Sequence, residues 1–229
     1  MKAAGFTLTA LLVIASLASA TGCDLLDPLP PVATPTSSIE DIIADIEPDQ
    51  VNLDKATAIN NPPTESEKAD LAYAREEAKL ARDLYQKFND KWNLPLFATL
   101  ARAEQGYMDR VKTLLDTLKL PDPASAVTGE FTNPALKQTY ASLLNKGLAS
   151  QTEALATGAY LEELLIKDLG VRVESVFRLD IIRGLGAVYS GSRSHLATLV
   201  KELKNKGVSY APQVLGADEF NRIVNPPLK

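Results

Sequence analysis

Four side chains in this sequence have the types and spacing to hold a metal ion or to move protons. Glu104 lies within a stripe of apolar residues at helical spacing, and Tyr107 follows it one turn later. Glu162, Glu163 and His195, the single histidine of the chain, lie on or beside other apolar helical stripes. A carboxylate is costly to bury unless it is paired, protonated or bound to a metal. Carboxylates and an imidazole that converge from different helices are typical ligands of a carboxylate-bridged metal site.

Each candidate also has an interpretation that needs no metal. A single histidine on an apolar face is commonly a hydrogen-bonded core residue, and the two acids at 162–163 could each pair with Arg or Lys from a neighbouring helix. A hydrogen bond from Tyr107, Tyr85 or His195 would satisfy Glu104 equally well. The residues alone leave these alternatives open.

Helices must position these side chains, and the sequence indicates where they begin and end. Thr64 and Glu67 have the spacing of a capping box, which predicts a helix start. Glu76 and Glu77 flank the stripe of this first helix, and we expect them on a solvated face. We predict helices over about 65–92, from Pro95 to before Pro121, over 134–147, from about 150 to 170 and over about 177–206. No run of alternating residues competes, so we predict an all-α four-helix bundle with a short helical insertion between the second and third long helices.

Composition narrows the classes of function. Of the 229 residues, 45% are hydrophobic and 6% aromatic, and the formal net charge is −5. No basic patch interleaved with aromatic residues occurs, so we expect no nucleic-acid binding. With one histidine, and no free thiol if the single cysteine is modified, a nucleophile–histidine–acid triad has little support. The sequence therefore favours a protein that is not a hydrolase.

The N-terminus is typical of an exported protein. Lys2 is followed by an apolar run over residues 6–17 and then by small residues up to Cys23. This run is short for a membrane span, and residues 1–22 are predicted to be a signal peptide. The sequence Leu-Ala-Ser-Ala-Thr-Gly-Cys resembles a bacterial lipobox, although Ala20 stands where Leu is more usual. We therefore predict lipidation of Cys23 and anchoring to a membrane of the bacterial cell envelope. The alternative is an ordinary signal peptide that leaves a free thiol.

Residues 23–64 are predicted to be a tether. Positions 24–64 contain seven of the fourteen prolines, eight acids and one lysine, a composition that cannot bury enough apolar surface to form a core. Residues 38–47 have the pattern of a short amphipathic helix, and whether it docks on the bundle stays open. The predicted organisation is thus a lipoprotein signal peptide (1–22), an acidic tether (23–64) and a helical bundle domain (65–229).

Several segments, taken together and in order, resemble one known family. They are Arg75-Glu-Glu-Ala-Lys-Leu-Ala-Arg-Asp-Leu-Tyr85, Leu96-Phe-Ala-Thr-Leu-Ala-Arg-Ala-Glu-Gln-Gly-Tyr-Met108, Gly129-Glu-Phe-Thr-Asn-Pro134, Tyr160-Leu-Glu-Glu-Leu164, Gly191-Ser-Arg-Ser-His-Leu196 and Tyr210-Ala-Pro-Gln-Val-Leu215. From about residue 65 to 225 the chain is similar to the ferritin-like family filed as domain of unknown function 2202. The resemblance implies a ferritin-like bundle, a fold whose best-known members hold two metal ions, usually iron.

The chain departs from the pattern of that family at three inward positions. Ala78 stands where the family usually has a third consecutive Glu, Tyr107 where it has His, and Leu165 where it commonly has Asp. His195 matches the family, but Ser192 stands where typical ferritin-like sites have a Glu. We interpret these three positions as degenerate ligand positions, which leaves Glu104 and a few partners for at most one ion.

Our leading hypothesis is a cell-envelope lipoprotein whose bundle is a non-catalytic structural or interaction module with a degenerate metal site and no cofactor. The alternative is a metal-binding or redox protein with a reduced site, in which Glu104, Glu162 or Glu163, and His195 hold iron or another divalent metal. A small apolar ligand near Ala78 is a third hypothesis. We expect membrane contact through the N-terminal lipid, while a protein partner and homo-oligomerisation stay open.

Overall fold

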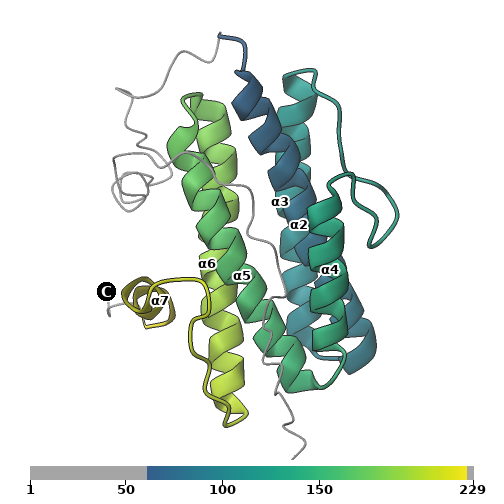
Figure 1. The fold of residues 1–229 in the computed structure, drawn as a ribbon, viewed down its shortest axis with the longest axis vertical. Helices are drawn as coiled ribbons and strands as arrows, with labels where there is room; N and C mark the ends of the chain where they lie inside the picture. Colours follow the sequence, from purple (N-terminus) through teal and green to yellow (C-terminus); the bar gives the residue numbers. More distant parts are fainter. Residues whose placement is uncertain (1–60, 226–229) are drawn as a thin grey trace, which may run out of the picture.

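The structure, a computed structural model, describes residues 61–225, and it places six helices and no strand within that range. The helices are α2 (Glu65–Trp92), α3 (Pro95–Thr117), α4 (Pro134–Gly147), α5 (Gln151–Ser175), α6 (Leu179–Asn205) and α7 (Ala217–Val224). The prediction of an all-α fold is confirmed. The four long helices α2, α3, α5 and α6 run side by side as a bundle (Figure 1). Helix α4 packs against α5 and α2, and α7 packs against α6.

The helix boundaries follow from local sequence signals. The Thr64 side chain accepts a hydrogen bond from the Glu67 amide, and the Glu67 side chain accepts one from the Thr64 amide, so the predicted capping box is formed. Asn93 ends α2 in the left-handed conformation, with φ 48°. Pro95 then opens α3, where its missing amide hydrogen leaves no bond unmade. Asn133 caps α4 through its side chain.

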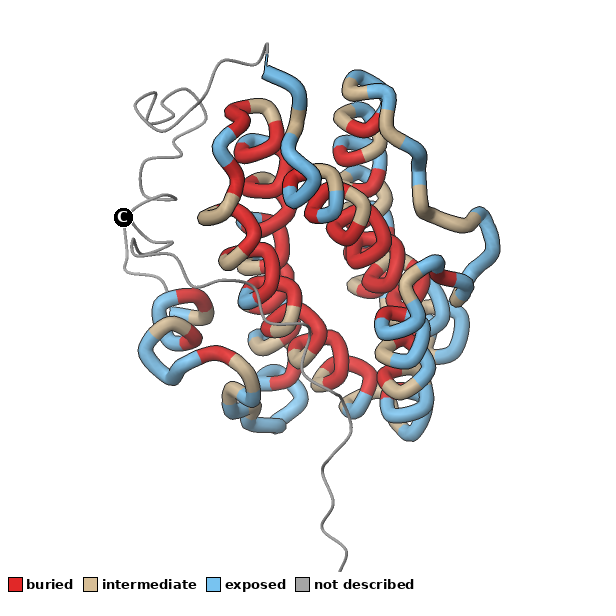
Figure 2. The backbone as a smooth tube through the Cα atoms, turned by 45° about the horizontal axis from the view of Figure 1, so that its top comes forward, coloured by how far each residue is buried: buried red, intermediate tan, exposed pale blue. Residues whose placement is uncertain are grey.

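The core lies where α2 and α3, which form one extensive pair, meet α5 and α6, which form another. In Figure 2 the buried parts of the long helices face the middle of the bundle. Residues from all four helices are fully buried there, among them Leu71, Phe97, Ile166 and Leu199. Any polar side chain that points into this core must therefore find a partner within the protein or bind an ion.

Two features differ from the prediction. Helix α5 continues to Ser175, past Gly170, and a short helix, α7, follows the last long helix. Only Phe220 and Ile223 of α7 are buried, which is too weak a pattern to identify in the sequence. The predicted signal peptide, Cys23 and the 38–47 segment lie outside the described residues. Within 61–225, no helix combines the length and apolarity needed to cross a membrane.

Candidate metal centre

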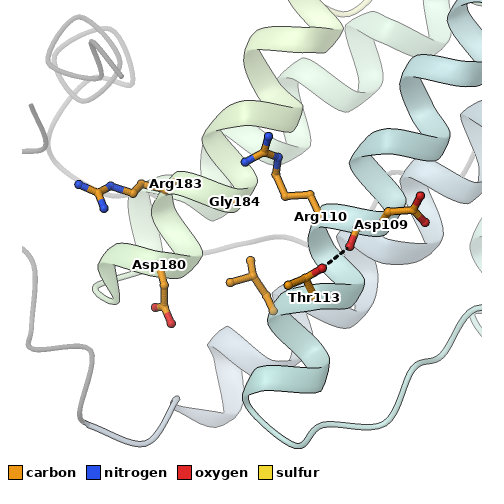
Figure 3. A pocket seen from close by; sticks show the side chains of 7 residues that line it. Asp109, Arg110, Thr113, Asp180, Arg183 and Gly184 are labelled. Carbon is orange, nitrogen blue, oxygen red and sulfur yellow. Dashed lines mark hydrogen bonds between the residues drawn. The ribbon is translucent and has the colours of Figure 1, made fainter. Parts of the chain in front are cut away.

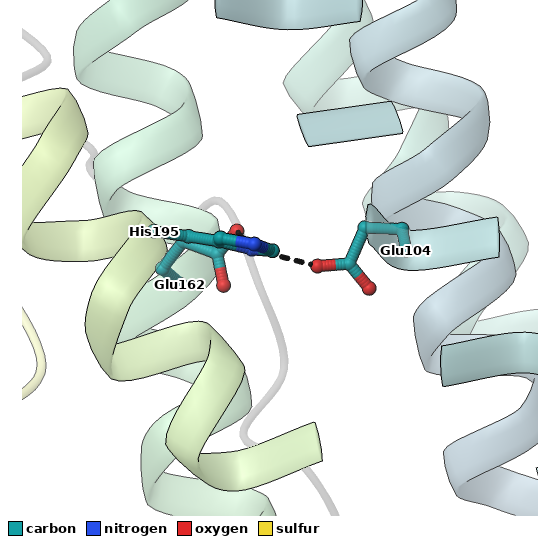
Figure 4. Close-up of side chains that lie close together, drawn as sticks. All are labelled: Glu104, Glu162 and His195. Atoms are coloured by element: carbon teal, nitrogen blue, oxygen red, sulfur yellow. Dashed lines mark ion pairs between the residues drawn. The ribbon is translucent and has the colours of Figure 1, made fainter. Parts of the chain in front are cut away.

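Three of the four candidate ligands meet in the middle of the bundle. Glu104 comes from α3, Glu162 from α5 and His195 from α6, and all three are buried. One ligand atom from each lies within 4.8 Å of the others. In Figure 4 the His195 ring points towards the Glu104 carboxylate, and Glu162 lies beside the ring. The convergence brings together side chains that are up to 91 positions apart in the sequence (195 minus 104).

The contacts within this trio are short but incomplete. The Nδ1 atom of His195 lies 2.9 Å from Oε1 of Glu104 and 3.3 Å from Oε1 of Glu162. Nevertheless, neither Nδ1 nor either Glu104 oxygen has a hydrogen bond of good geometry among the described residues, so the contact of His195 with Glu104 is an ion pair. Nearly all buried polar groups in folded proteins have a hydrogen-bond partner. One imidazole nitrogen and the carboxylates of two helices therefore converge with few hydrogen bonds to satisfy them.

Tyr85 supports the site from α2. Its hydroxyl donates a hydrogen bond to Oε1 of Glu162 at 2.5 Å, and the whole residue is buried. Among the partners considered for Glu104, Tyr85 thus serves Glu162 instead, while His195 is the group next to Glu104. The second oxygen of Glu162 and the hydroxyl of Ser192, one turn before His195, have no hydrogen-bond partner among the described side chains. These two oxygen atoms are thus not occupied by hydrogen bonds.

Burial and neighbouring charges shift the acidity of the trio. Burial raises the pKa of Glu104 to about 7, the Glu162 charge adds to this rise, and His195 opposes it. Burial by itself lowers the pKa of His195, but the charges of Glu162 and Glu104 outweigh it and raise that pKa to about 10. With both carboxylates ionised and the imidazole protonated, the site carries one net negative charge (two minus one). A low-dielectric interior favours neutralising such a charge with a proton or a cation.

Three other buried glutamates contrast with this trio because backbone amides donate to their oxygens, whereas one oxygen each of the buried Asp70 and Glu77 also lacks a hydrogen bond among the described residues. Glu67 accepts from the amides of Phe177 and Arg178, which fixes the corner between α5 and α6. Glu76 accepts from the amides of Thr132 at 2.5 Å and Asn133 at 2.9 Å, at the start of α4. These acids have a structural role that the trio lacks.

Glu163 belongs to this structural class, and the candidacy that the sequence raised for it needs correction. Its carboxylate accepts hydrogen bonds from the amides of residues 213–215 and from the hydroxyl of Tyr210 at 2.6 Å. It therefore faces the segment between α6 and α7, and not the trio. On α5, successive residues are rotated by about 100°, so Glu162 and Glu163 point in different directions although both are buried.

The prediction that Glu76 and Glu77 lie on a solvated face is wrong. Both are 3% exposed, because α4, α5 and the loop before α4 cover sides of α2 that the sequence pattern left open. Burial raises the pKa of Glu77 well above its ordinary value, and the Asp168 charge adds to that rise. Arg172 forms ion pairs with Asp168 and with Asp70, and its Nη1 atom lies 2.7 Å from Oδ1 of Asp70. Sequence reasoning missed this second polar cluster, although the four-residue spacing of Asp168 and Arg172 is a helical ion-pair signal.

Comparison with known proteins places the chain in a family. Residues 67–227 match the family described as Uncharacterized protein domain (DUF2202). This chain belongs to that family. The uncharacterized protein MJ0754 of Methanocaldococcus jannaschii is 38% identical over 165 residues, which cover 72% of this chain and 89% of that protein. The crystal structure of the hypothetical protein MJ0754 from Methanococcus jannaschii matches with a TM-score of 0.72 and 36% identity, over 76% of this chain and 100% of that one.

The three departures from the DUF2202 pattern take different places in the structure. Ala78 and Leu165 are buried core residues, at 1% and 2% exposure. Tyr107 is half-buried, and its ring centroid lies 5.9 Å from that of His195. None of the three belongs to the group of converging ligand atoms.

The residues present fit one divalent transition-metal ion. An imidazole nitrogen and carboxylate oxygens are ligands that iron, manganese and zinc accept, with metal–ligand bonds of about 2.0–2.2 Å. Two ligands at right or tetrahedral angles around such an ion are about 3 Å apart, which agrees with the 2.9 and 3.3 Å separations. With three protein ligands, coordination positions remain for water or another small molecule.

Proposed function

We propose that this protein is a ferritin-like bundle that binds one divalent transition-metal ion through Glu104, Glu162 and His195. The observation that carries the proposal is the convergence of one nitrogen and two carboxylates from three helices within 4.8 Å, with both Glu104 oxygens lacking a hydrogen bond. Three other buried glutamates, Glu67, Glu76 and Glu163, accept hydrogen bonds from backbone amides and show how this fold satisfies a structural acid. The trio does not follow that rule, which supports a ligand role.

Each residue of the site would have a separate role in holding the ion. Glu104 and Glu162 would provide charge, and His195 would coordinate through a neutral ring, so binding must displace its proton. The Tyr85 hydroxyl holds Glu162 in place through its 2.5 Å bond, as outer partners of metal ligands commonly do. An ion with open coordination positions would supply Lewis-acid or one-electron redox chemistry there. The apolar residues Ala78 and Leu165 leave few donors for a second ion, which favours a single one.

Metal analysis tests the proposal. The full-length protein would be loaded separately with Fe(II), Mn(II) and Zn(II), dialysed, and its metal measured by mass spectrometry. We expect about one ion per chain, lost in Glu104→Ala and in His195→Ala, because three ligands hold the ion. Glu163→Gln is the matched control, since it neutralises the adjacent buried acid outside the trio, and it should retain the metal.

A metal-free wild-type protein that is stably folded would contradict the proposal. The hypothesis of a structural or interaction module without a metal would then account better for the chain. Loss of metal in Glu163→Gln alone, with retention in Glu104→Ala, would contradict the assignment of ligands.

We further propose that the bundle is exported and anchored to a membrane of the cell envelope through lipid on Cys23. The support is the signal-like segment and lipobox-like sequence that precede this single cysteine. Cys23→Ser should move the protein from the membrane fraction to the soluble fraction. An unchanged membrane fraction would contradict the anchor and leave the metal proposal untouched.

A further inference from the structure

A hollow of about 460 Å³ opens on the surface where α3 and α6 run alongside each other. It is lined from α3 by Asp109, Arg110, Thr113 and Leu114, and from α6 by Asp180, Arg183 and Gly184. In Figure 3, Arg110 extends from α3 towards α6 across this hollow. The four charged residues sum to zero, so the hollow has no strong preference for the sign of a small solute.

The seam between α3 and α6 leads from this hollow to the trio. A Cβ atom on Gly184 would lie 2.4 Å from Leu114, and a Cβ on Gly191 would lie 2.0 Å from the Tyr107 hydroxyl. Next along the same seam comes the 2.9 Å contact of His195 with Glu104. The residue numbers of these pairs fall along α3 (114, 107, 104) while they rise along α6 (184, 191, 195). The two helices therefore run antiparallel along this seam. From residue 110 to residue 104 the axial distance is about 9 Å, six residues at about 1.5 Å each.

Tyr107 lies on this seam between the hollow and the trio. Its phenol packs against Gly191, a close approach that only a residue without a Cβ allows. Burial raises the pKa of Tyr107, the charges of Glu104 and Glu162 raise it further, and Arg110 lowers it. The pKa of the phenol is thus shifted by charges of the trio and by the charge of Arg110, which lines the hollow.

The most exposed member of the trio is His195, the neighbour of Tyr107. The His195 side chain, which faces the Tyr107 ring, is 10% exposed, whereas the side chains of Glu104 and Glu162 are fully buried. By contrast, Tyr85, which bonds to Glu162, and Phe97 are both fully buried and stack with ring centroids 6.1 Å apart. An aromatic stack without exposed surface offers no passage, while a half-buried phenol can rotate outwards.

We propose that an ion or small molecule reaches the trio from the α3–α6 hollow, and that Tyr107 closes this route. This inference rests on the proposed function, since it concerns entry to the metal centre. The Tyr107 ring lies beside His195, and its outer end rests on Gly191, so an outward rotation of this half-buried side chain would uncover the site without moving a helix. Tyr107 is in this scheme an access-controlling residue that sets rates, and not a ligand.

Rates of Zn(II) uptake and release test the proposal. Zn(II) suits the measurement because it is redox-inert and binds nitrogen and oxygen sites more tightly than Fe(II) or Mn(II). Uptake would be followed by stopped-flow with a zinc indicator, and release by transfer to an excess of a chromogenic chelator. In the full-length Tyr107→Ala variant we expect both rates to rise about tenfold, equivalent to about 1.4 kcal/mol of barrier, with Kd unchanged within about threefold. Parallel changes in both rates at constant Kd would not arise from damage to the ligands.

Two glycine substitutions make a matched pair of controls. Gly191→Ala pushes the Tyr107 phenol away from α6 and should reproduce the faster exchange with the ring still present. It therefore also tests the proposal if Tyr107→Ala folds poorly. Gly147→Ala makes a comparable insertion away from the hollow, against the ring of Phe88, and should leave the rates unchanged. Tyr107→Phe keeps the ring and should behave as wild type.

The failures are distinguishable. A wild-type protein that binds no Zn(II) overturns the proposed function and this inference with it. Binding with unchanged rates in Tyr107→Ala and Gly191→Ala overturns the route alone. Equal acceleration in Gly147→Ala would show general loosening of the bundle, and a weaker Kd in Tyr107→Phe would show that the phenol oxygen is a ligand. Either result also overturns the route.

Discussion

Replacing Glu104 with Gln tests whether this acid costs the fold stability in order to serve a site. The substitution keeps the shape of the side chain and removes its charge. Glu104 is fully buried, and burial raises its pKa from 4.5 to about 7. A raised pKa means that the folded state favours the neutral acid. Its contribution to stability is therefore complete below about pH 4.5 and is lost as the pH rises through about 7.

The size of the effect follows from the shift. A difference of about 2.5 pKa units at about 1.4 kcal/mol each amounts to about 3 kcal/mol at high pH. Gln has no such loss, so the stability of metal-free Glu104→Gln relative to wild type should rise by about 2 kcal/mol between about pH 5.5 and about pH 8.5. The lost attraction to His195 lowers the stability of the variant at both pH values. His195 keeps Glu162 as a charged partner, so the variant leaves no unpaired imidazolium.

Urea unfolding followed by circular dichroism, with EDTA present, measures this difference at the two pH values. The control is Glu76→Gln, which is similarly buried but bonded to two backbone amides and should be destabilised at both pH values. The reasoning would be refuted by a Glu104→Gln protein whose stability relative to wild type does not rise between the two pH values. Glu104 would then be a structural acid held by hydrogen bonds. A relative stability that rises with pH, combined with loss of metal, is the expected signature of a functional residue.

Three further predictions concern the polar residues that hold the bundle together. Glu163→Gln should lower the free energy of unfolding by about 2 kcal/mol and speed amide hydrogen exchange at 213–215, because a charged acceptor is lost; unchanged exchange would contradict its role. Lys79→Met should cost about 3 kcal/mol in urea unfolding because it removes the partner of Asp83 from a fully buried ion pair, and a cost below about 1 kcal/mol would show that other donors suffice. Thr64→Ala should lower the unfolding free energy by about 1 kcal/mol through loss of the capping box, and an unchanged thermal midpoint would argue against that cap.

Helix positions were predictable because their signals are local. The capping box at Thr64, the proline at position 95 and the Asn133 cap each act within one turn of the chain. Those signals operate before any tertiary contact forms, so the bounds of α2 and α4 follow from them. Helix α7 escaped prediction because its two buried residues pack on distant parts of the chain and leave no periodic pattern of useful length.

The candidate site was only partly predictable. Helical stripes identified Glu104, Glu162 and His195 as inward residues, but they could not separate Glu162 from its neighbour Glu163. Helix α5 is buried on several sides, so an inward position no longer indicates a single direction. The same difficulty affected Glu77, whose burial depends on how α5 lies against α2.

The sequence by itself determined the helical class, the main helix limits, the signal-like N-terminus and the small set of acids that could serve a site. Only the tertiary structure decided which of those acids meet. Residues 104, 162 and 195 belong to helices that touch through long-range packing, and a rotation of one helix by a single residue, about 100°, would separate them. The same packing placed Tyr107 against Gly191, where we propose that it covers the route to the trio.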